Sequence, residues 1–257
     1  MNQYIYGIDV GGTSIKIGLF EKESMMLKAD FEVSTPKTDH NESIFLSIYQ
    51  NLVKCNNEHS ITMDDVLGIG MDVPCPVKQG FVHTCSNLDL KHIDLIKSME
   101  KYLPKHIKIV VANDATIAGF GENESLETPY ENAVLITLGT GIGGGIILDG
   151  KIVEGSTGLA GEIGHIKVYD ESNKVCGCGS KGCLEQICGT VGILEFTKEL
   201  LINTPSILDI DRLTVKTIFD AAKQGDNVAT QTVHRVAKYI GIAASILAVT
   251  IEPDVFI

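Results

Sequence analysis

The sequence is short of positive charge. Its 257 residues include 21 Lys and Arg against 33 Asp and Glu, which gives a formal net charge of −12. Nucleic acids and anionic membrane surfaces attract proteins through clustered basic residues. The acidic balance therefore argues against both as partners, although it leaves room for a small anionic ligand in a local pocket.

Long hydrophobic runs are missing as well. No apolar stretch reaches the ~18 residues that a membrane-spanning helix needs, and the best candidate, residues 239–251, is shorter. The N-terminus has no basic segment of the kind that opens a secretory signal peptide. Hydrophobic residues make up 44% of the chain and charged residues 21%, ordinary globular usage that excludes disorder and fibrous repeats. We therefore predict a soluble, cytoplasmic protein without a membrane partner.

Glycine, by contrast, is clustered in two similar turns. Apolar, β-branched segments flank each turn, at residues 4–10 and 15–20 and again at 133–138 and 143–148. The turns consist of Gly11, Gly12 and Thr13 and of Gly139, Thr140 and Gly141. Glycine lets a phosphate reach backbone N–H groups that a side chain would screen. Neither turn has the spacing of a P-loop or a dinucleotide fingerprint, so each alone is equally compatible with a plain tight turn, whereas the pair favours phosphate binding.

Carboxylates stand at the ends of two predicted strands. Asp9 comes just before the first glycine turn and suits a hydrated Mg²⁺, which binds through few carboxylates together with nucleotide phosphates. Asn113 and Asp114 follow the apolar strand at 107–112. A carboxylate at this end of a strand faces the ligand crevice of an open α/β sheet, where it can act as a general base. Asn and Asp also suit a helix N-cap, and the sequence leaves the two interpretations equal.

Four of the seven cysteines lie between residues 176 and 188. Such spacing in a reducing cytosol favours metal over disulfides. Three of these cysteines and one histidine offer the four N/S ligands of a structural Zn²⁺ site: His165, Cys176, Cys178 and Cys183. The alternative is a loop of free thiols, and Cys188, where a helix begins, is expected to be a core cysteine. Glu162 and Glu185 flank the cluster as hydrogen-bond acceptors for a polyhydroxylated ligand or as ordinary surface charges.

The order of the elements predicts an α/β protein. Strands alternate with helices through the first half, which suggests a mixed or parallel sheet with helical crossovers. The two glycine hairpins suggest two related lobes that share a cleft, the first at residues 1–112 and the second at 113–257. Residues 254–257 predict the start of a buried strand, so we expect a further segment beyond Ile257.

These residues together resemble the ROK family of bacterial sugar kinases and repressors. The matching stretches are 8–13, 113–115, 138–145, 160–165 and 176–185, in the family's order and spacing. The resemblance implies an actin-like (ribonuclease H-like) ATPase fold with two lobes around a central cleft. It also implies an ATP-dependent hexose 6-kinase, with glucose as the first substrate and a homodimer as the expected assembly. N-acetylmannosamine and other hexoses, N-acetylhexosamines and β-glucosides are the alternative substrates.

The resemblance also assigns roles to residues. Asp114 would be the base that activates the sugar 6-hydroxyl for attack on the γ-phosphate. The turns at 11–13 and 139–141 would hold the phosphates of ATP, with Asp9 near Mg²⁺. The sugar hydroxyls would be bound by Asn113, Glu162, His165 and Glu185, and His165 would also ligate the structural zinc. Two residues depart from the family pattern: Cys75 stands where glycine is usual, in a loop by the sugar, and Thr116 stands where asparagine is usual.

Two other functional classes fit less well. A sugar-sensing repressor of the same family would carry a helix-turn-helix before the first hairpin, and here the hairpin begins almost at residue 1. A zinc-stabilised sugar-binding protein without catalysis is the third hypothesis. The intact Asp114 and the two intact glycine turns speak against it.

Overall fold

The computed structural model describes residues 3–37, 42–169 and 174–257. The chain forms two compact units, Met1–Ala118 with Glu154–Ala160 and Gly119–Val153 with Gly161–Ile257. Residues 113–118 therefore lie in the first unit, whereas the sequence analysis assigned them to the second lobe. The reason is the sheet ladder, because Asn113 pairs with Val73 and so cannot be separated from the first sheet.

The first unit is built on a mixed sheet of five strands in the order β3-β2-β1-β4-β7. Its strands are β1 (Tyr4–Val10), β2 (Ser14–Glu21), β3 (Leu27–Ser34), β4 (Val66–Val73) and β7 (Lys108–Asn113). The first three are antiparallel, and β4 and β7 run parallel to β1. A separate hairpin joins β5 (Phe81–Cys85) to β6 (Leu90–Asp94). The first predicted glycine hairpin is confirmed as the β1–β2 connection.

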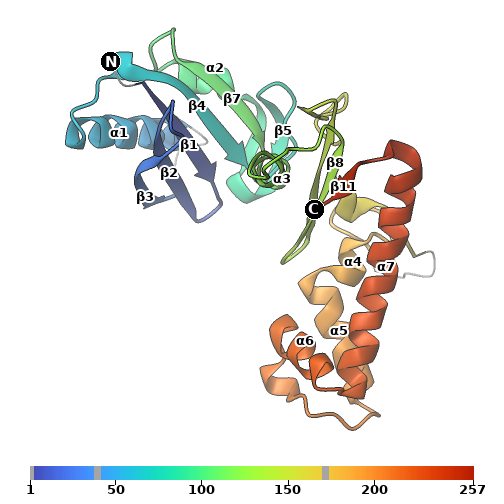
Figure 1. Cartoon of the computed structure of the whole chain (residues 1–257). Helices are drawn as coiled ribbons and strands as arrows, with labels where there is room; N and C mark the ends of the chain where they lie inside the picture. Colours follow the sequence, from blue (N-terminus) through green and yellow to red (C-terminus); the bar gives the residue numbers. More distant parts are fainter. Residues whose placement is uncertain (1–2, 38–41, 170–173) are drawn as a thin grey trace. The chain divides into compact units, whose positions relative to one another are not determined.

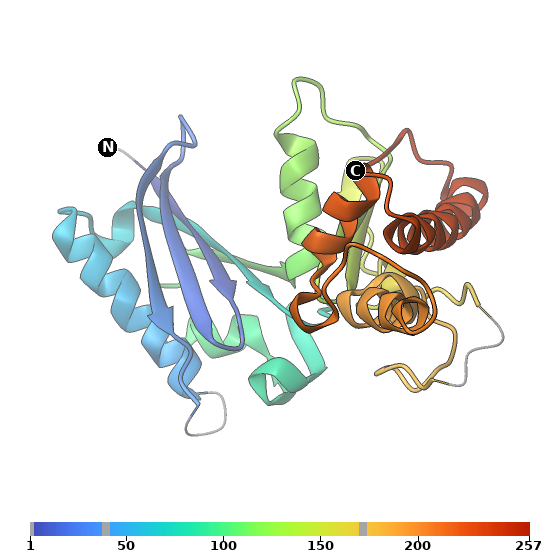
Figure 2. The ribbon, with the colours of Figure 1, turned by 90° about the horizontal axis from the view of Figure 1, so that it is seen from below.

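Two helices, α1 (Glu42–Glu58) and α2 (Leu95–Glu100), cover one face of this sheet (Figure 2). Alternate strand residues such as Ile8 and Ile17 are buried on that face against apolar helix residues such as Ile48. The strand residues between these buried positions point to the opposite face of the sheet. There, glycines at positions 18, 7 and 70 form one row across β2, β1 and β4, which leaves that face hollow.

The second unit holds a four-stranded sheet in the order β10-β9-β8-β11. Its strands are β8 (Ala133–Leu138), β9 (Ile142–Leu148), β10 (Lys151–Ile152) and β11 (Val255–Phe256). The second glycine hairpin, β8–β9, is confirmed. The strand expected at 254–257 also exists and runs parallel to β8. Its predicted burial is wrong, since Phe256 is 40% exposed at the edge of the sheet.

Helices complete the second unit, and their bounds are α4 (Glu185–Cys188), α5 (Thr190–Leu201), α6 (Val215–Lys223) and α7 (Asn227–Ile251). Figure 1 shows α7 running alongside α4 and α5, with α6 against one end of it. In the described part of the chain, α7 alone is long and apolar enough to cross a membrane by length and composition, which is weak evidence for a span. It carries Arg235 and Lys238 near its middle and packs against α5 and α6. The remaining helix, α3 (Asp114–Glu124), begins in the first unit.

Candidate active site

Three carboxylates gather at the carboxyl ends of the parallel strands of the first unit. Asp9 on β1 pairs in register with Asp72 on β4, so both side chains leave the same face of the sheet. Lys16, opposite Asp9 on β2, forms an ion pair with it at 3.1 Å between Nζ and Oδ2. Burial, together with the charges of Asp9 and Asp114, raises the pKa of Asp72 to about 7. The three aspartates therefore share one electrostatic environment.

Asp72 is a residue that the sequence analysis missed. The sequence carried a signal for it, because Asp72 is the second-to-last residue of an apolar stretch, as Asp9 is. A cavity of about 560 Å³ lies over the glycine row and is lined by Asp9, Lys16 and Asp72 together with apolar side chains such as Phe31. The carboxylates of Asp9 and Asp72 are thus open to a ligand from the hollow face of the sheet.

We expect Asp72→Asn to stabilise the protein at alkaline pH. A carboxyl whose pKa is about 7 in the folded state and about 4 when unfolded stabilises the fold when protonated, and this contribution is lost as pH rises through 7. Asparagine cannot ionise beside Asp9 and Asp114. The unfolding free energy of the variant should exceed that of the wild type by about 1–2 kcal/mol at pH 8, less than the full linkage value because Asp72 is partly solvated.

Urea unfolding in magnesium-free buffer at pH 4 and pH 8 measures this difference. The two proteins should be closely similar at pH 4, where Asp72 is protonated in the folded chain and still about half protonated in the unfolded chain, so that little of the linkage penalty has developed. An equal effect of the substitution at both pH values would contradict the assignment.

The sequence left open whether Asn113 and Asp114 cap a helix or face a ligand, and the structure shows that Asn113 is a cap. Asn113 caps α3, since its Oδ1 accepts hydrogen bonds from the N–H of Thr116 at 3.1 Å and from its hydroxyl at 3.3 Å. Its Nδ2 donates to the carbonyl of Cys75 at 3.4 Å. Both departures from the family pattern therefore contact the same asparagine. Asp114 is the first residue of α3, and its Oδ1 accepts the N–H of Ala115 at 2.7 Å. Burial raises the pKa of its carboxyl.

The second glycine turn is tied to the start of α4. The carboxylate of Glu185 accepts the N–H of Ile142 at 3.1 Å. Gly141 allows this approach, because a side chain at that position would overlap the Glu185 carboxylate. Glu185 therefore contacts the backbone of the turn in this structure, and its contact with a sugar stays a prediction.

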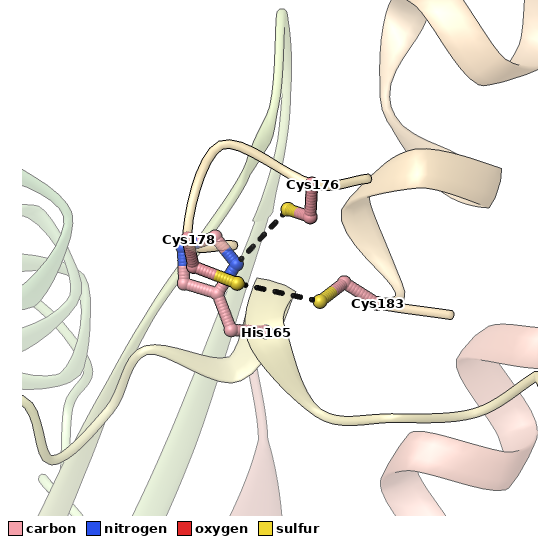
Figure 3. Close-up of side chains that lie close together, drawn as sticks. All are labelled: His165, Cys176, Cys178 and Cys183. Carbon is pink, nitrogen blue, oxygen red and sulfur yellow. Dashed lines mark hydrogen bonds between the residues drawn. The ribbon is translucent and has the colours of Figure 1, made fainter. Parts of the chain in front are cut away.

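The four predicted metal ligands converge in the second unit (Figure 3). Their ligand atoms all lie within 4.8 Å of one another, with Cys176 Sγ 3.6 Å from His165 Nδ1 and Cys178 Sγ 3.6 Å from Cys183 Sγ. A tetrahedral Zn²⁺ with ordinary bond lengths separates its ligand atoms by about 3.5–3.8 Å. All three cysteines are free thiols. Donor types and spacing thus fit a closed structural zinc site, and buried Cys188 lies outside it.

His165 connects the cluster to Glu162. Its Nδ1 faces Cys176, while its Nε2 lies 3.9 Å from Oε2 of Glu162, three residues earlier. The short helix at Ile163–His165 sets this spacing. Within the second unit the structure therefore brings Glu162 and His165 together beside the cluster, and the binding of a sugar by these two side chains stays a prediction.

Known proteins are similar to this chain over most of its length. The chain is 34% identical to the glucokinase of Halalkalibacterium halodurans over 262 residues, covering 98% of this chain and 78% of that protein. The N-acetylmannosamine kinase of Shigella boydii is 36% identical over 162 residues, 63% of this chain and 52% of that one. A ROK family glucokinase from Streptomyces griseus, solved in complex with glucose and AMPPNP, superposes with a TM-score of 0.70 at 32% identity, covering 98% of this chain and 81% of that one. The model of the ROK family matches residues 5–257, and the chain belongs to this family.

Proposed function

We propose that the protein is an ATP-dependent sugar kinase that transfers the γ-phosphate to the 6-hydroxyl of a hexose, with glucose as the preferred substrate. The observation that carries the proposal is the placement of Asp114 directly after β7, open to solvent and near enough to Asp9 for the two charges to interact. The likeness to named glucokinases over 98% of the chain supports glucose. The N-acetylmannosamine kinase matches only 63% of it, which makes that sugar the second candidate.

The fold that we propose is the actin-like ATPase fold, with the two compact units as its two lobes. The ROK glucokinase structure supports this at a TM-score of 0.70. Each unit contributes one glycine hairpin with free backbone donors, the feature expected of a fold in which both lobes bind nucleotide phosphates. We expect such an enzyme to be soluble and to use ATP in the cytoplasm, the location predicted from the sequence. The homodimer also stays an expectation.

The proposed reaction needs one proton acceptor and several charge-stabilising groups. Asp114 takes the proton of the sugar 6-hydroxyl as that oxygen bonds to the γ-phosphorus, while the bond from phosphorus to the β-phosphate oxygen breaks and ADP leaves. The N–H groups of the two glycine turns stabilise the phosphate charge. Sugar hydroxyls are held by Asn113, Glu162, His165 and Glu185. Mg²⁺, which Asp9 suits as a ligand, would supply charge neutralisation when bound.

The pH profile should show the ionisation of Asp114. A general base works only when ionised, and burial raises the pKa of this carboxyl above the ordinary aspartate value of about 3.9. We therefore expect kcat/KM to fall as pH decreases, with the midpoint of the acid limb above that value. Initial rates with saturating Mg²⁺ between pH 3.5 and pH 8.5 measure the limb. A flat profile in protein that stays folded at the acid end would argue against Asp114 as the base.

The direct test of the proposed function is ADP release from MgATP across a panel of hexoses and N-acetylhexosamines. Glucose should give the highest kcat/KM. A dominant rate with N-acetylmannosamine would replace the substrate and keep the class. Absence of turnover with every sugar, together with a melting temperature that one sugar raises, would favour the non-catalytic sugar-binding protein.

A further inference from the structure

The first glycine turn is held by a threonine that lies outside its motif. Thr35 follows β3 and is only 7% exposed. Its hydroxyl donates to the carbonyl of Gly11 at 2.6 Å, and its N–H donates to the carbonyl of Thr13 at 3.0 Å. One residue, 24 positions from the glycine, therefore fixes two carbonyls of the turn.

The second turn is held in the same way. Thr190 is the first residue of α5. Its hydroxyl donates to the carbonyl of Gly139 at 2.8 Å, and its N–H donates to the carbonyl of Thr140 at 3.1 Å. In both units the hydroxyl binds the first glycine of the turn and the N–H binds a later residue. The two units thus share one device on two different elements, a strand end and a helix start.

These bonds decide where the N–H groups of the turns point. The C=O and N–H of a trans peptide point in opposite directions, and every peptide bond that the structure describes is trans. The bond on the carbonyl of Gly11 therefore directs the N–H of Gly12 away from Thr35. The bonds on the second turn direct the N–H groups of Thr140 and Gly141 away from α5.

The three N–H groups are available to a ligand. None of Gly12, Thr140 and Gly141 donates its N–H to a protein acceptor within residues 3–37, 42–169 and 174–257. Side chains are excluded where they would interfere, since a Cβ at Gly12 would lie 2.9 Å from the carbonyl oxygen of Asn87. Converging backbone donors without side chains form the nests that bind phosphate oxygens.

We propose, resting on the kinase function above, that Thr35 and Thr190 are positioning residues for the nucleotide phosphates. Glycine turns are conformationally permissive, and an unfixed turn must lose that freedom when it binds. Each threonine orders the peptide planes of its turn before ATP arrives. Within each unit the backbone donors of the turn are thereby held ready for a phosphate oxygen, although the threonine itself does not touch it.

The test compares valine and serine at each position. Thr35→Val and Thr190→Val keep the shape of the side chain and remove the donor, whereas Thr35→Ser and Thr190→Ser keep the donor. Calorimetric titration with MgAMPPNP should show Kd raised roughly five- to tenfold for each valine variant, the effect of one net hydrogen bond, and within about twofold for each serine variant.

Thr250→Val is the matched control. Its hydroxyl also donates to a main-chain carbonyl, that of Ile246 at 2.8 Å on α7, and its loss should leave nucleotide affinity unchanged. Sugar affinity, measured by the same titration, should stay at the wild-type value in all five variants. This separates positioning of the turn from general loss of structure, and melting temperatures identify any variant that fails to fold.

Two results with the variants would overturn the proposal. One is wild-type nucleotide affinity in both valine variants, and the other is an equal loss of sugar and nucleotide affinity. A wild-type protein that binds MgAMPPNP but phosphorylates no sugar would refute the kinase function while leaving the comparison of valine and serine intact. A wild-type protein that binds no nucleotide would refute both.

Discussion

Asp114→Asn is expected to abolish phosphoryl transfer while leaving sugar binding nearly intact. Asparagine keeps the size of the side chain and its ability to accept a hydrogen bond, but it cannot take a proton at neutral pH. General base catalysis contributes about 10²–10⁴-fold to rates, so kcat should fall by at least two orders of magnitude. The KM for MgATP should change little, because the glycine turns that we propose to bind the phosphates are unaltered.

The measurement pairs steady-state ADP release with calorimetric titration of the sugar. Asp64→Asn is the control, since Asp64 is an exposed aspartate of the same unit and lies outside the site. It should keep wild-type turnover. The assignment of Asp114 as the base would be withdrawn if Asp114→Asn turned over within tenfold of the wild type. A variant that lost sugar affinity to the same extent as kcat would instead make Asp114 a binding residue.

Local patterns predicted the parts of the site that are close in sequence. The strand–glycine–strand spacing predicted both hairpins correctly, because each turn and its two flanking strands lie within about twenty residues of sequence. The metal cluster was predictable for the same reason, since His165 to Cys183 spans one short segment and thiol spacing is distinctive. The cap at Asn113 also follows from neighbouring residues, although only the structure separates its role from that of Asp114.

The parts that were missed depend on contacts between distant segments. Asp72 meets Asp9 only because β4 pairs with β1 in parallel, at a register that a single sequence does not reveal. Thr35 and Thr190 act across 24 and 51 residues, and nothing in their own surroundings marks them as partners of a glycine turn. Glu185 was expected at a sugar, and its bond to Ile142 required the packing of α4 against the turn.

This packing also links the metal cluster to the second glycine turn, the proposed phosphate site. Cys183 precedes Glu185 by two residues, and Glu185 and Thr190 together hold the second turn at three points. A metal that fixes Cys183 therefore fixes the start of the segment on which the turn rests. The cluster can be structural in its chemistry and still affect the affinity for ATP.

Cys178→Ser should accordingly release zinc and destabilise the protein. Cys178 is exposed, whereas Cys176 and Cys183 are buried, so its substitution removes a predicted metal ligand with little change in packing. A structural zinc contributes several kcal/mol to folding, and each kcal/mol shifts the midpoint of a chain this size by about 2–4 °C, so we expect a decrease of roughly 10 °C. The KM for MgATP should rise more than the KM for sugar, since the second turn loses its support.

Metal analysis of protein purified from zinc-supplemented medium provides the first readout, with one zinc per chain expected for the wild type and much less for Cys178→Ser. Cys188→Ala is the matched control, because it removes a buried thiol of the same unit from outside the cluster. It should keep its zinc even where it loses stability, so that metal content and packing are separated. A wild type without zinc would reduce the four residues to a loop of free thiols, and the support of the second turn would then rest on Glu185 and Thr190 alone.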